Sequence, residues 1–302
     1  MEDAKASLTA EAAAIVRAVE SAKPEGERVC YDPYAQYFIR PQFRIIGWSK
    51  RLTRFLMWFA VDQRYPGVTT EIVLRTRYID DHLRKCIDDG VRQLVVLGAG
   101  YDSRAQRIDG LKGKVRVFEV DHPATQKVKV ERLKEIPGSL SDHVVYVPVD
   151  FRKEKLDQRL FERGYDKELK TLFVWEGVTP YLTAEAVDET LAFVVNNSGQ
   201  GTSIIFNYFV EPVGDGPGDP EMSWWTVKKR QKLLEFQERI GEPFTFGIPE
   251  GGVEEFLCSR GFCQVVNATC KDMRNALFAG ANRKRRFTPL MATVHATVKP
   301  PG

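Results

Sequence analysis

A short apolar run that ends in two glycines constrains the fold of this chain most. Leu94–Leu97 are all aliphatic, Gly98-Ala99-Gly100 follows, and Tyr101-Asp102-Ser103-Arg104 begins an amphipathic stretch. Such a run predicts a buried parallel strand that turns sharply into a helix. Glycines in the turn let a ligand approach the backbone closely. We therefore expect a ligand at the end of this strand.

A second predicted strand favours a nucleoside as that ligand. Val115–Val120 ends at Asp121, at roughly the 20-residue spacing at which an acid can bind ribose hydroxyls. Ser103, however, stands where the dinucleotide fingerprint has its third glycine, and Asp102 adds negative charge where a pyrophosphate would lie. Both features disfavour NAD and FAD. S-adenosylmethionine has no phosphate, and its sulfonium and ammonium cations tolerate a nearby acid.

Acidic residues also end the third and fourth predicted strands, as Asp150-Phe151 and Glu176. Because the carboxyl ends of parallel strands line the ligand crevice of open α/β sheets, we expect these acids in the same site as Asp121. Each has a structural alternative. Asp121 could cap the helix before Pro123, Asp150 could cap a helix that begins near Arg152, Phe151 could be a core residue, and Glu176 could pair with an arginine.

Strands and helices alternate after the glycine turn. The pattern predicts strands near residues 93–98, 115–121, 144–149, 171–176 and 202–209, with helices near 102–108, 123–136, 152–163 and 183–197. This alternation indicates right-handed βαβ units and a doubly wound, mainly parallel α/β sheet. Two final strands near 262–269 and 290–298, joined by a wide loop, predict an antiparallel pair at the edge. Further helices are expected at 7–22, 69–89, 223–240 and 249–260.

The sequence divides into a helical N-terminal cap, residues 1–68, and a main domain, residues 69–302, with an inserted segment at 210–248. Residues 38–65 of the cap are rich in aromatic side chains and arginines. This stretch could be a helical pair packed on the main domain or a lid over an apolar substrate. Its mixed acids and bases make association with a membrane surface the poorer alternative.

Composition excludes several classes of protein. A net charge of +3, from 44 basic and 41 acidic residues, does not argue for nucleic acid, although the basic run Asn282–Arg286 could touch phosphates rather than form a solvated loop. The five cysteines form no Cys-x-x-Cys pair and the histidines are scattered, which disfavours a disulfide framework or a metal site. With neither a signal peptide nor an apolar run long enough to span a bilayer, a cytoplasmic protein is expected.

Several sequence blocks occurring in one order resemble the leucine carboxyl methyltransferase family, especially its bacterial S-adenosylmethionine-dependent O-methyltransferase branch. The resemblance covers nearly the whole chain. Two departures are mild, since Ser103 stands where the family commonly has Thr and Phe151 where it often has Leu. The blocks are Thr9-Ala10, Arg17 to Glu20, Asp32-Pro33-Tyr34-Ala35, Arg75-Thr76-Arg77 before Asp80-Asp81, Leu97 to Arg104, Glu119 to Pro123, Val147 to Phe151, and Glu176 to Leu182.

The resemblance implies a seven-stranded, Rossmann-like class I methyltransferase sheet that binds S-adenosylmethionine. In that fold Arg75 would meet the methionine carboxylate, and Gly98, with Gly100 in the same turn, the methionine end. Asp121 would hold the ribose, Asp150-Phe151 the adenine, and Glu176 the amino group. Transfer of a methyl group needs two reactants held in line. A carboxylate acceptor needs no base, whereas a hydroxyl acceptor does; no catalytic residue is assigned, and no metal is expected.

Three functions remain open from the sequence. The first is methylation of an oxygen, carboxylate or hydroxyl, of a small apolar or aromatic metabolite, with Arg40, Arg44 or Arg64 of the cap as partners for a carboxylate. The second is methylation of the C-terminal carboxyl group of a protein. The third is a non-catalytic nucleotide- or nucleic-acid-binding module. Methylation of a base fits poorly, because Val178-Thr179-Pro180-Tyr181 lacks the polar first residue that holds an exocyclic amine.

Overall fold

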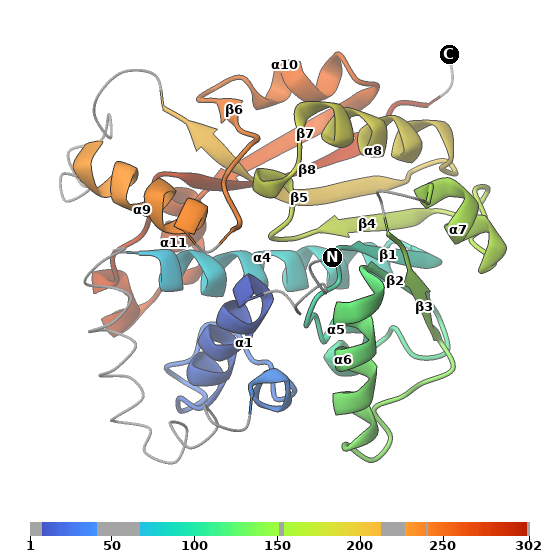
Figure 1. Cartoon of the computed structure of the whole chain (residues 1–302), viewed down its shortest axis with the longest axis horizontal. Helices are drawn as coiled ribbons and strands as arrows, with labels where there is room; N and C mark the ends of the chain where they lie inside the picture. Colours follow the sequence, from blue (N-terminus) through green and yellow to red (C-terminus); the bar gives the residue numbers. More distant parts are fainter. Residues whose placement is uncertain (1–7, 41–66, 151–153, 213–226, 240, 301–302) are drawn as a thin grey trace.

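The computed structural model of the chain describes residues 8–40, 67–150, 154–212, 227–239 and 241–300 (Figure 1). Most of the aromatic segment 38–65, including Arg44 and Arg64, lies outside the described residues. Phe151 and the glycine- and proline-rich stretch 213–220 also lie outside them.

One sheet organises the molecule, in the strand order β3-β2-β1-β4-β5-β8-β7. β1 to β5 run parallel, whereas β8 is antiparallel to both β5 and β7. The doubly wound α/β class and the antiparallel edge pair are therefore confirmed. The two-residue β6 pairs with β5 outside the seven-stranded path. The strands are β1 (Gln93–Leu97), β2 (Arg116–Asp121), β3 (Val144–Pro148), β4 (Thr171–Trp175), β5 (Ser203–Glu211), β6 (Ile248–Pro249), β7 (Phe262–Thr269) and β8 (Met291–Val298).

Helices cover both faces of the sheet, with α8 and α10 on one side and α4 on the other (Figure 1). Three short 3-10 helices are η1 (Ala35–Phe38), η4 (Thr179–Tyr181) and η6 (Gly280–Lys284). No described helix is long and apolar enough to cross a membrane. The α-helices are α1 (Leu8–Ser21), α4 (Val68–Asp88), α5 (Arg104–Arg107), α6 (Pro123–Lys134), α7 (Leu156–Glu162), α8 (Ala184–Asn196), α9 (Val227–Arg239), α10 (Val253–Cys258) and α11 (Cys270–Leu277).

The apolar run of β1 is buried on both faces. Leu94 and Val96 pack in one cluster with Leu83 of α4, while Val95 and Leu97 pack in the other, with α7 and α8. Successive side chains of a strand point to opposite faces, so a strand between two helical layers must be apolar throughout. This burial fixes where the strand ends and hence where the glycine turn lies.

Two local features differ from the sequence prediction. Residues 270–277, which were expected to form part of the wide loop, form α11. A capping box starts this helix, in which Thr269 and Asp272 exchange side-chain to backbone hydrogen bonds. The N-cap residue of α7 is Lys155, so this helix begins later than the position near Arg152 that the sequence predicted.

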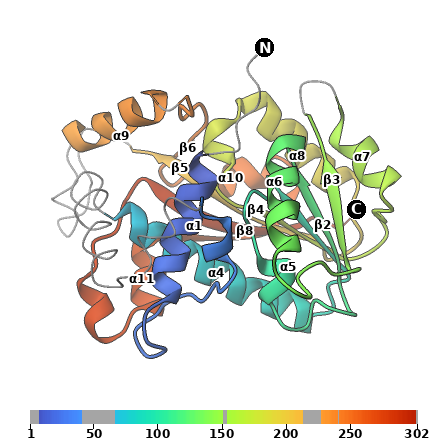
Figure 2. The same cartoon turned by 60° about the horizontal axis from the view of Figure 1, so that its bottom comes forward.

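Helix α1 packs against α4, although the rest of the cap segment intervenes between them in the chain (Figure 2). Arg285, from the basic run after β7, pairs with Glu20 of α1 at 3.1 Å. Asn282 of the same run donates to the backbone oxygen of Glu27. The basic run thus holds the cap in place with at least two of its side chains.

Candidate functional site

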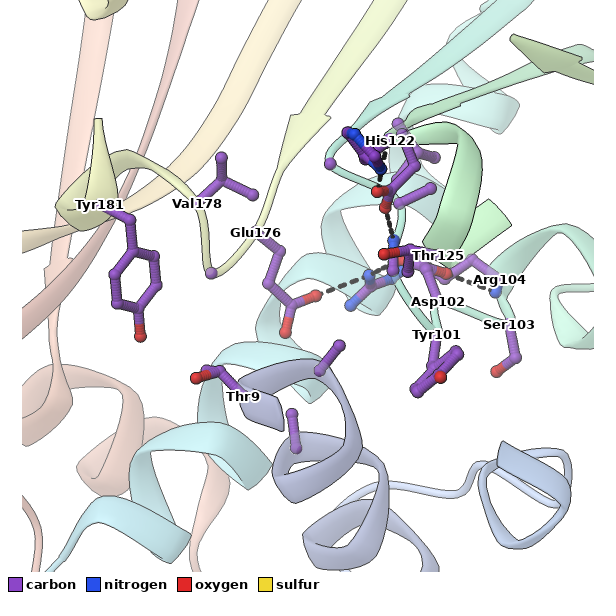
Figure 3. Close-up of a pocket in the computed structure, with 18 of the residues that line it drawn as sticks. Thr9, Tyr101, Asp102, Ser103, Arg104, His122, Thr125, Glu176, Val178 and Tyr181 are labelled. Atoms are coloured by element: carbon purple, nitrogen blue, oxygen red, sulfur yellow. Dashed lines mark hydrogen bonds and ion pairs between the residues drawn. The ribbon is translucent and has the colours of Figure 1, made fainter. Parts of the chain in front are cut away.

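A cavity of about 360 Å³ lies between α1 and the carboxyl ends of β1, β2 and β4. The lining includes Ala10, Ala13 and Arg17 of α1, the turn after β1, and Glu176 just beyond β4. In Figure 3, Tyr181, Val178 and Thr9 lie on one side of Glu176, whereas Asp102, Tyr101 and His122 lie on the other. The cavity therefore has two ends with Glu176 between them.

The glycine turn leaves backbone exposed to the cavity. Gly98 has a φ of +65° and Gly100 a φ of +44°, in the left-handed region that side chains disfavour. A β-carbon on Gly98 would lie 2.4 Å from Cγ2 of Val178, and one on Gly100 would lie 3.3 Å from Cβ of Ala10. Glycine at position 98 is thus required by conformation and by space.

Asp121 lines the cavity at the end of β2. Its carboxylate accepts hydrogen bonds from the backbone N–H groups of Gly100 and His122, the latter at 2.6 Å. Burial raises the pKa of Asp121, and these two donors oppose the rise. The N-cap of α6 is His122, whose Nδ1 accepts from the N–H of Ala124 at 3.2 Å. The alternative of Asp121 as a helix cap is therefore wrong.

Glu176 is held by two arginines. Its Oε1 accepts from Nε of Arg75 at 2.9 Å and its Oε2 from Nη1 of Arg104 at 2.7 Å. Burial alone would raise its pKa, but the guanidinium groups of Arg104 and Arg75 hold the pKa of Glu176 well below its ordinary value. The structural alternative, pairing with an arginine, is therefore present, and the carboxylate also lines the cavity.

Arg75 is clamped on two sides. Its Nη1 donates to both carboxylate oxygens of Glu71 at 3.1 Å, and its Nε donates to Glu176. Nη2 lies beside the turn after β4, where a β-carbon on Gly177 would be 3.3 Å away. The fixed fork of a guanidinium can present a third edge to a ligand when two edges are held.

Buried ion pairs continue behind Glu176. Arg104 also binds Asp80, at 2.7 Å, and Asp102, and Arg107 binds Asp80 at 2.6 Å. From the sequence, Asp102 is expected to add negative charge where a pyrophosphate would lie, but Arg104 compensates that charge. Asp102 therefore disfavours a phosphate ligand less than the sequence predicts.

A second pair links α1 to the glycine turn. Arg17 donates to Asp32 at 2.8 Å and to the backbone oxygen of Tyr101 at 2.7 Å, and Ser103 donates to Asp32. Arg17, Asp32 and Arg104 stand in sequence blocks that the family resemblance rests on, but no role was predicted for them. Only their convergence from distant segments shows that they belong to the site.

Of the predicted adenine contacts, one is not among the residues that line this cavity and the other lies outside the described residues. Asp150 is half-buried and its backbone N–H donates to Glu154, but it is not among the described residues that line the cavity. Phe151 lies outside the described residues. Their assignment to the adenine therefore stays a prediction.

The sequence profile of the leucine carboxyl methyltransferase family matches residues 10–195. This chain belongs to that family. The match covers α1, the glycine turn, Asp121 and Glu176, and so contains most of the cavity lining. The chain is accordingly an S-adenosyl-L-methionine-dependent methyltransferase.

Two bacterial relatives carry the name “putative S-adenosyl-L-methionine-dependent methyltransferase”. FRAAL3836 of Frankia alni is 33% identical over 269 residues, covering 81% of this chain and 91% of that protein. YktD of Bacillus subtilis is 29% identical over 242 residues, covering 80% and 75%.

Solved structures share the fold at low identity. A DUF574 family protein of Streptomyces avermitilis superposes with a TM-score of 0.60 at 11% identity, covering 96% of this chain and 97% of the other. A Thermobifida fusca protein gives a TM-score of 0.56 at 15% identity, covering 95% and 94%. At these identities the likeness concerns the fold alone.

The charges in the cavity of this methyltransferase fit its cofactor. In the described part of the chain, four cavity-lining arginines and seven carboxylates occur in or directly behind the lining. Burial raises the pKa values of two of these carboxyl groups, Glu71 and Asp121. Even if both are protonated, the remaining carboxylates outnumber the guanidinium groups. A site of this sign suits a sulfonium and an ammonium. The residues are Arg17, Arg75, Arg104 and Arg107 with Asp32, Glu71, Asp80, Asp102, Asp121, Glu176 and Glu242.

Proposed function

We propose that this methyltransferase transfers its methyl group to an oxygen atom, carboxylate or hydroxyl, of a small apolar or aromatic metabolite. The observation that carries the proposal is the composition of the cavity end beyond Glu176. Val178 lies there beside the ring of Tyr181, and Leu182, the residue after Tyr181, also lines the cavity. Apolar walls with few polar groups are typical of small-molecule sites.

We further propose how the cofactor is held. Arg75 would bind the methionine carboxylate with its remaining guanidinium edge, and the backbone of Gly98 and Gly100 would admit the methionine end. Glu176, which stays ionised, would bind the ammonium, and Asp121 the ribose hydroxyls. Asp150 and Phe151 would contact the adenine. The proposed domain limits are the cap at 1–68 and the main domain at 69–302, with the insertion at 210–248.

The residues of the site act by position and charge. S-adenosylmethionine supplies an electrophilic methyl group, which an acceptor oxygen attacks in line with the bond to sulfur. The carboxylates of Glu176 and Asp121 would hold the methionine end and the ribose of the cofactor, and α1 forms one wall of the cavity. His122 serves as the N-cap of α6 through Nδ1, which supports leaving the catalytic base unassigned.

A transfer experiment with carbon-13-labelled methyl groups tests the proposal. The protein is incubated with methyl-labelled S-adenosylmethionine and a metabolite extract, and the products are separated into protein and small molecules. We expect label in a small molecule, with the carbon-13 shift of an oxygen-bound methyl group. Label on a protein band would favour the carboxyl-terminal alternative, and an N-methyl shift would overturn the oxygen assignment.

A binding experiment tests the ribose assignment separately. Replacing Asp121 by Asn removes the charge and keeps the shape, so S-adenosylhomocysteine should bind about tenfold more weakly in calorimetry, since a hydrogen bond to a charged group contributes about 1.5 kcal/mol or more. Unchanged affinity would remove Asp121 from the ribose site and leave the transfer reaction in place.

A further inference from the structure

The end of the cavity beyond Glu176 carries a carboxylate of its own. Glu242, from the segment after α9, lines the cavity with Thr9, Tyr181 and Leu182. The hydroxyl of Thr9 donates to Oε2 of Glu242, which ties α1 to a residue 233 positions away. This end is thus walled by apolar groups, one acid and one phenol.

The phenol at this end keeps its proton. Burial, with a contribution from the charge of Glu242, raises the pKa of Tyr181 to about 12. Nε2 of Gln237 lies 3.4 Å from the phenol oxygen, and Phe244 packs edge-on against the ring. Tyr181 is therefore a neutral group that can donate a hydrogen bond to an acceptor oxygen.

The cations of the described cavity are committed to other carboxylates. Arg75 is held between Glu71 and Glu176, and Arg104 is bound by three acids. Arg40, which the sequence suggested as a partner for an acceptor carboxylate, binds Glu11 at 2.7 Å. A carboxylate brought next to Glu242 has no proton to donate to it, whereas a hydroxyl has one.

We propose that Glu242 and Tyr181 form the acceptor subsite and select an uncharged hydroxyl group, of an alcohol or a phenol, against a carboxylate. A hydroxyl can donate to Glu242 and accept from Tyr181, whereas a carboxylate can only accept. This inference rests on the proposed oxygen methylation and narrows it to one of its two acceptor classes. A bond forms between the hydroxyl oxygen and the methyl carbon as the bond from that carbon to sulfur breaks, and S-adenosylhomocysteine leaves. The hydroxyl proton passes to the carboxylate of Glu242 that accepts it, and the product is a methyl ether.

The first test concerns the charge next to the transferred methyl group. Sinefungin is the cofactor analogue that bears an amine where the methylsulfonium stands, whereas S-adenosylhomocysteine is uncharged there. Both are titrated into the wild type, Glu242→Gln and Glu238→Gln by calorimetry. Glu238 is an exposed acid at the end of α9, so its variant matches the change in net charge.

In Glu242→Gln we expect the preference for sinefungin over S-adenosylhomocysteine to fall about fivefold, because an attractive charge is lost. Glu238→Gln should keep the wild-type preference. An unchanged preference in Glu242→Gln, or an equal loss for both ligands, overturns the placement of Glu242. The measurement is the ratio of the two ligands' affinities for the same folded variant. A general disturbance of the site weakens both ligands equally and leaves this ratio unchanged, whereas loss of the Glu242 charge changes it.

The second test concerns the acceptor class in the wild type. The methyl-labelled product from a metabolite extract is treated with mild base, which releases methanol from a methyl ester and leaves a methyl ether intact. We expect the label to stay in the product. Volatile label overturns the hydroxyl assignment while leaving oxygen methylation standing, whereas an N-methyl product overturns the proposed function itself.

Discussion

At the scale of single residues, the site depends on charges that are buried in pairs. Replacing one partner of such a pair leaves an uncompensated buried charge, which is strongly destabilising. Glu176, Arg75 and Arg104 are coupled in this way. Removal of any one charge would therefore change the stability of the fold and the affinity for ligand together, and the two effects could not be separated. Substitutions that keep the charge are the informative ones.

Arg75→Lys is such a substitution. Lysine keeps the charge but lacks the planar fork, so it cannot hold Glu71 and Glu176 and also face the ligand carboxylate. We expect S-adenosylhomocysteine to bind about tenfold more weakly, a change of ~1.4 kcal/mol, and 5′-methylthioadenosine, which has no carboxylate, to bind unchanged. Calorimetry measures both.

Arg77→Lys is the matched control, because Arg77 lies on the same helix and pairs with Asp81 at an exposed position. It should leave both affinities unchanged. Equal weakening of both ligands in Arg75→Lys would mean that Arg75 only supports the structure.

At the scale of elements, α4 joins the site to the far edge of the sheet. Arg75 lies toward its N-terminal end. Two turns later, the ring of His82 packs at a tilt of 35° against His295 of β8, with ring centroids 4.2 Å apart. Burial, and then His295 and Lys85, lower the pKa of His82 to about 4, and the pKa of His295 is also lowered. Both rings are therefore neutral in the folded protein near neutral pH.

This pair predicts a loss of stability in mild acid. The unfolded chain binds protons near the ordinary histidine pKa of 6.5, whereas the folded rings do not, so acidification favours unfolding. The contribution of these two neutral histidines to the free energy of unfolding should be fully present above pH 6.5 and should be lost as the pH drops toward 4. Tm measured down to about pH 5, above the ordinary carboxyl pKa, should decline in the wild type. The Tm should decline less in the His82→Gln/His295→Gln variant. An equal decline of Tm in both proteins would mean that these two histidines are not the source of the acid sensitivity.

At the scale of the whole molecule, α1 closes the cavity by contacts with segments remote in sequence. Arg17 binds Asp32 and the glycine turn, Thr9 binds Glu242, and Glu20 binds Arg285. A ligand beneath α1 therefore links the cap to the strand ends. Release of that ligand requires these contacts to loosen.

Hydrogen exchange should reveal this linkage. At S-adenosylhomocysteine concentrations of about a hundred times Kd, binding adds about 2.7 kcal/mol, so amides of α1 that open only with ligand release should exchange up to about a hundredfold more slowly. Residues 97–103 should behave alike. Helix α10, on the other face of the sheet, serves as the internal control. If the ligand protects residues 97–103 but leaves hydrogen exchange in α1 unaltered, the placement of α1 over the ligand is contradicted.

Local patterns in the sequence were enough to predict the order of the main strands and helices and the position of the glycine turn. Its apolar strands must be buried on both faces, and Gly98 permits a backbone that other residues resist. It also placed Asp121 and Glu176 at strand ends. It missed α11, although the helix starts with a capping box and is amphipathic, because a helix of eight residues gives only a short local signal.

Which charges meet in the site depends on the packing of the whole chain. Arg17, Asp32, Arg104, Arg107 and Glu242 come from segments that no spacing rule relates, and a hydrogen bond between Thr9 and Glu242 depends on how α1 lies on the finished sheet. Local patterns report backbone conformation and burial. Ion pairing inside the cavity depends on where distant chain segments converge, which is a property of the packed molecule.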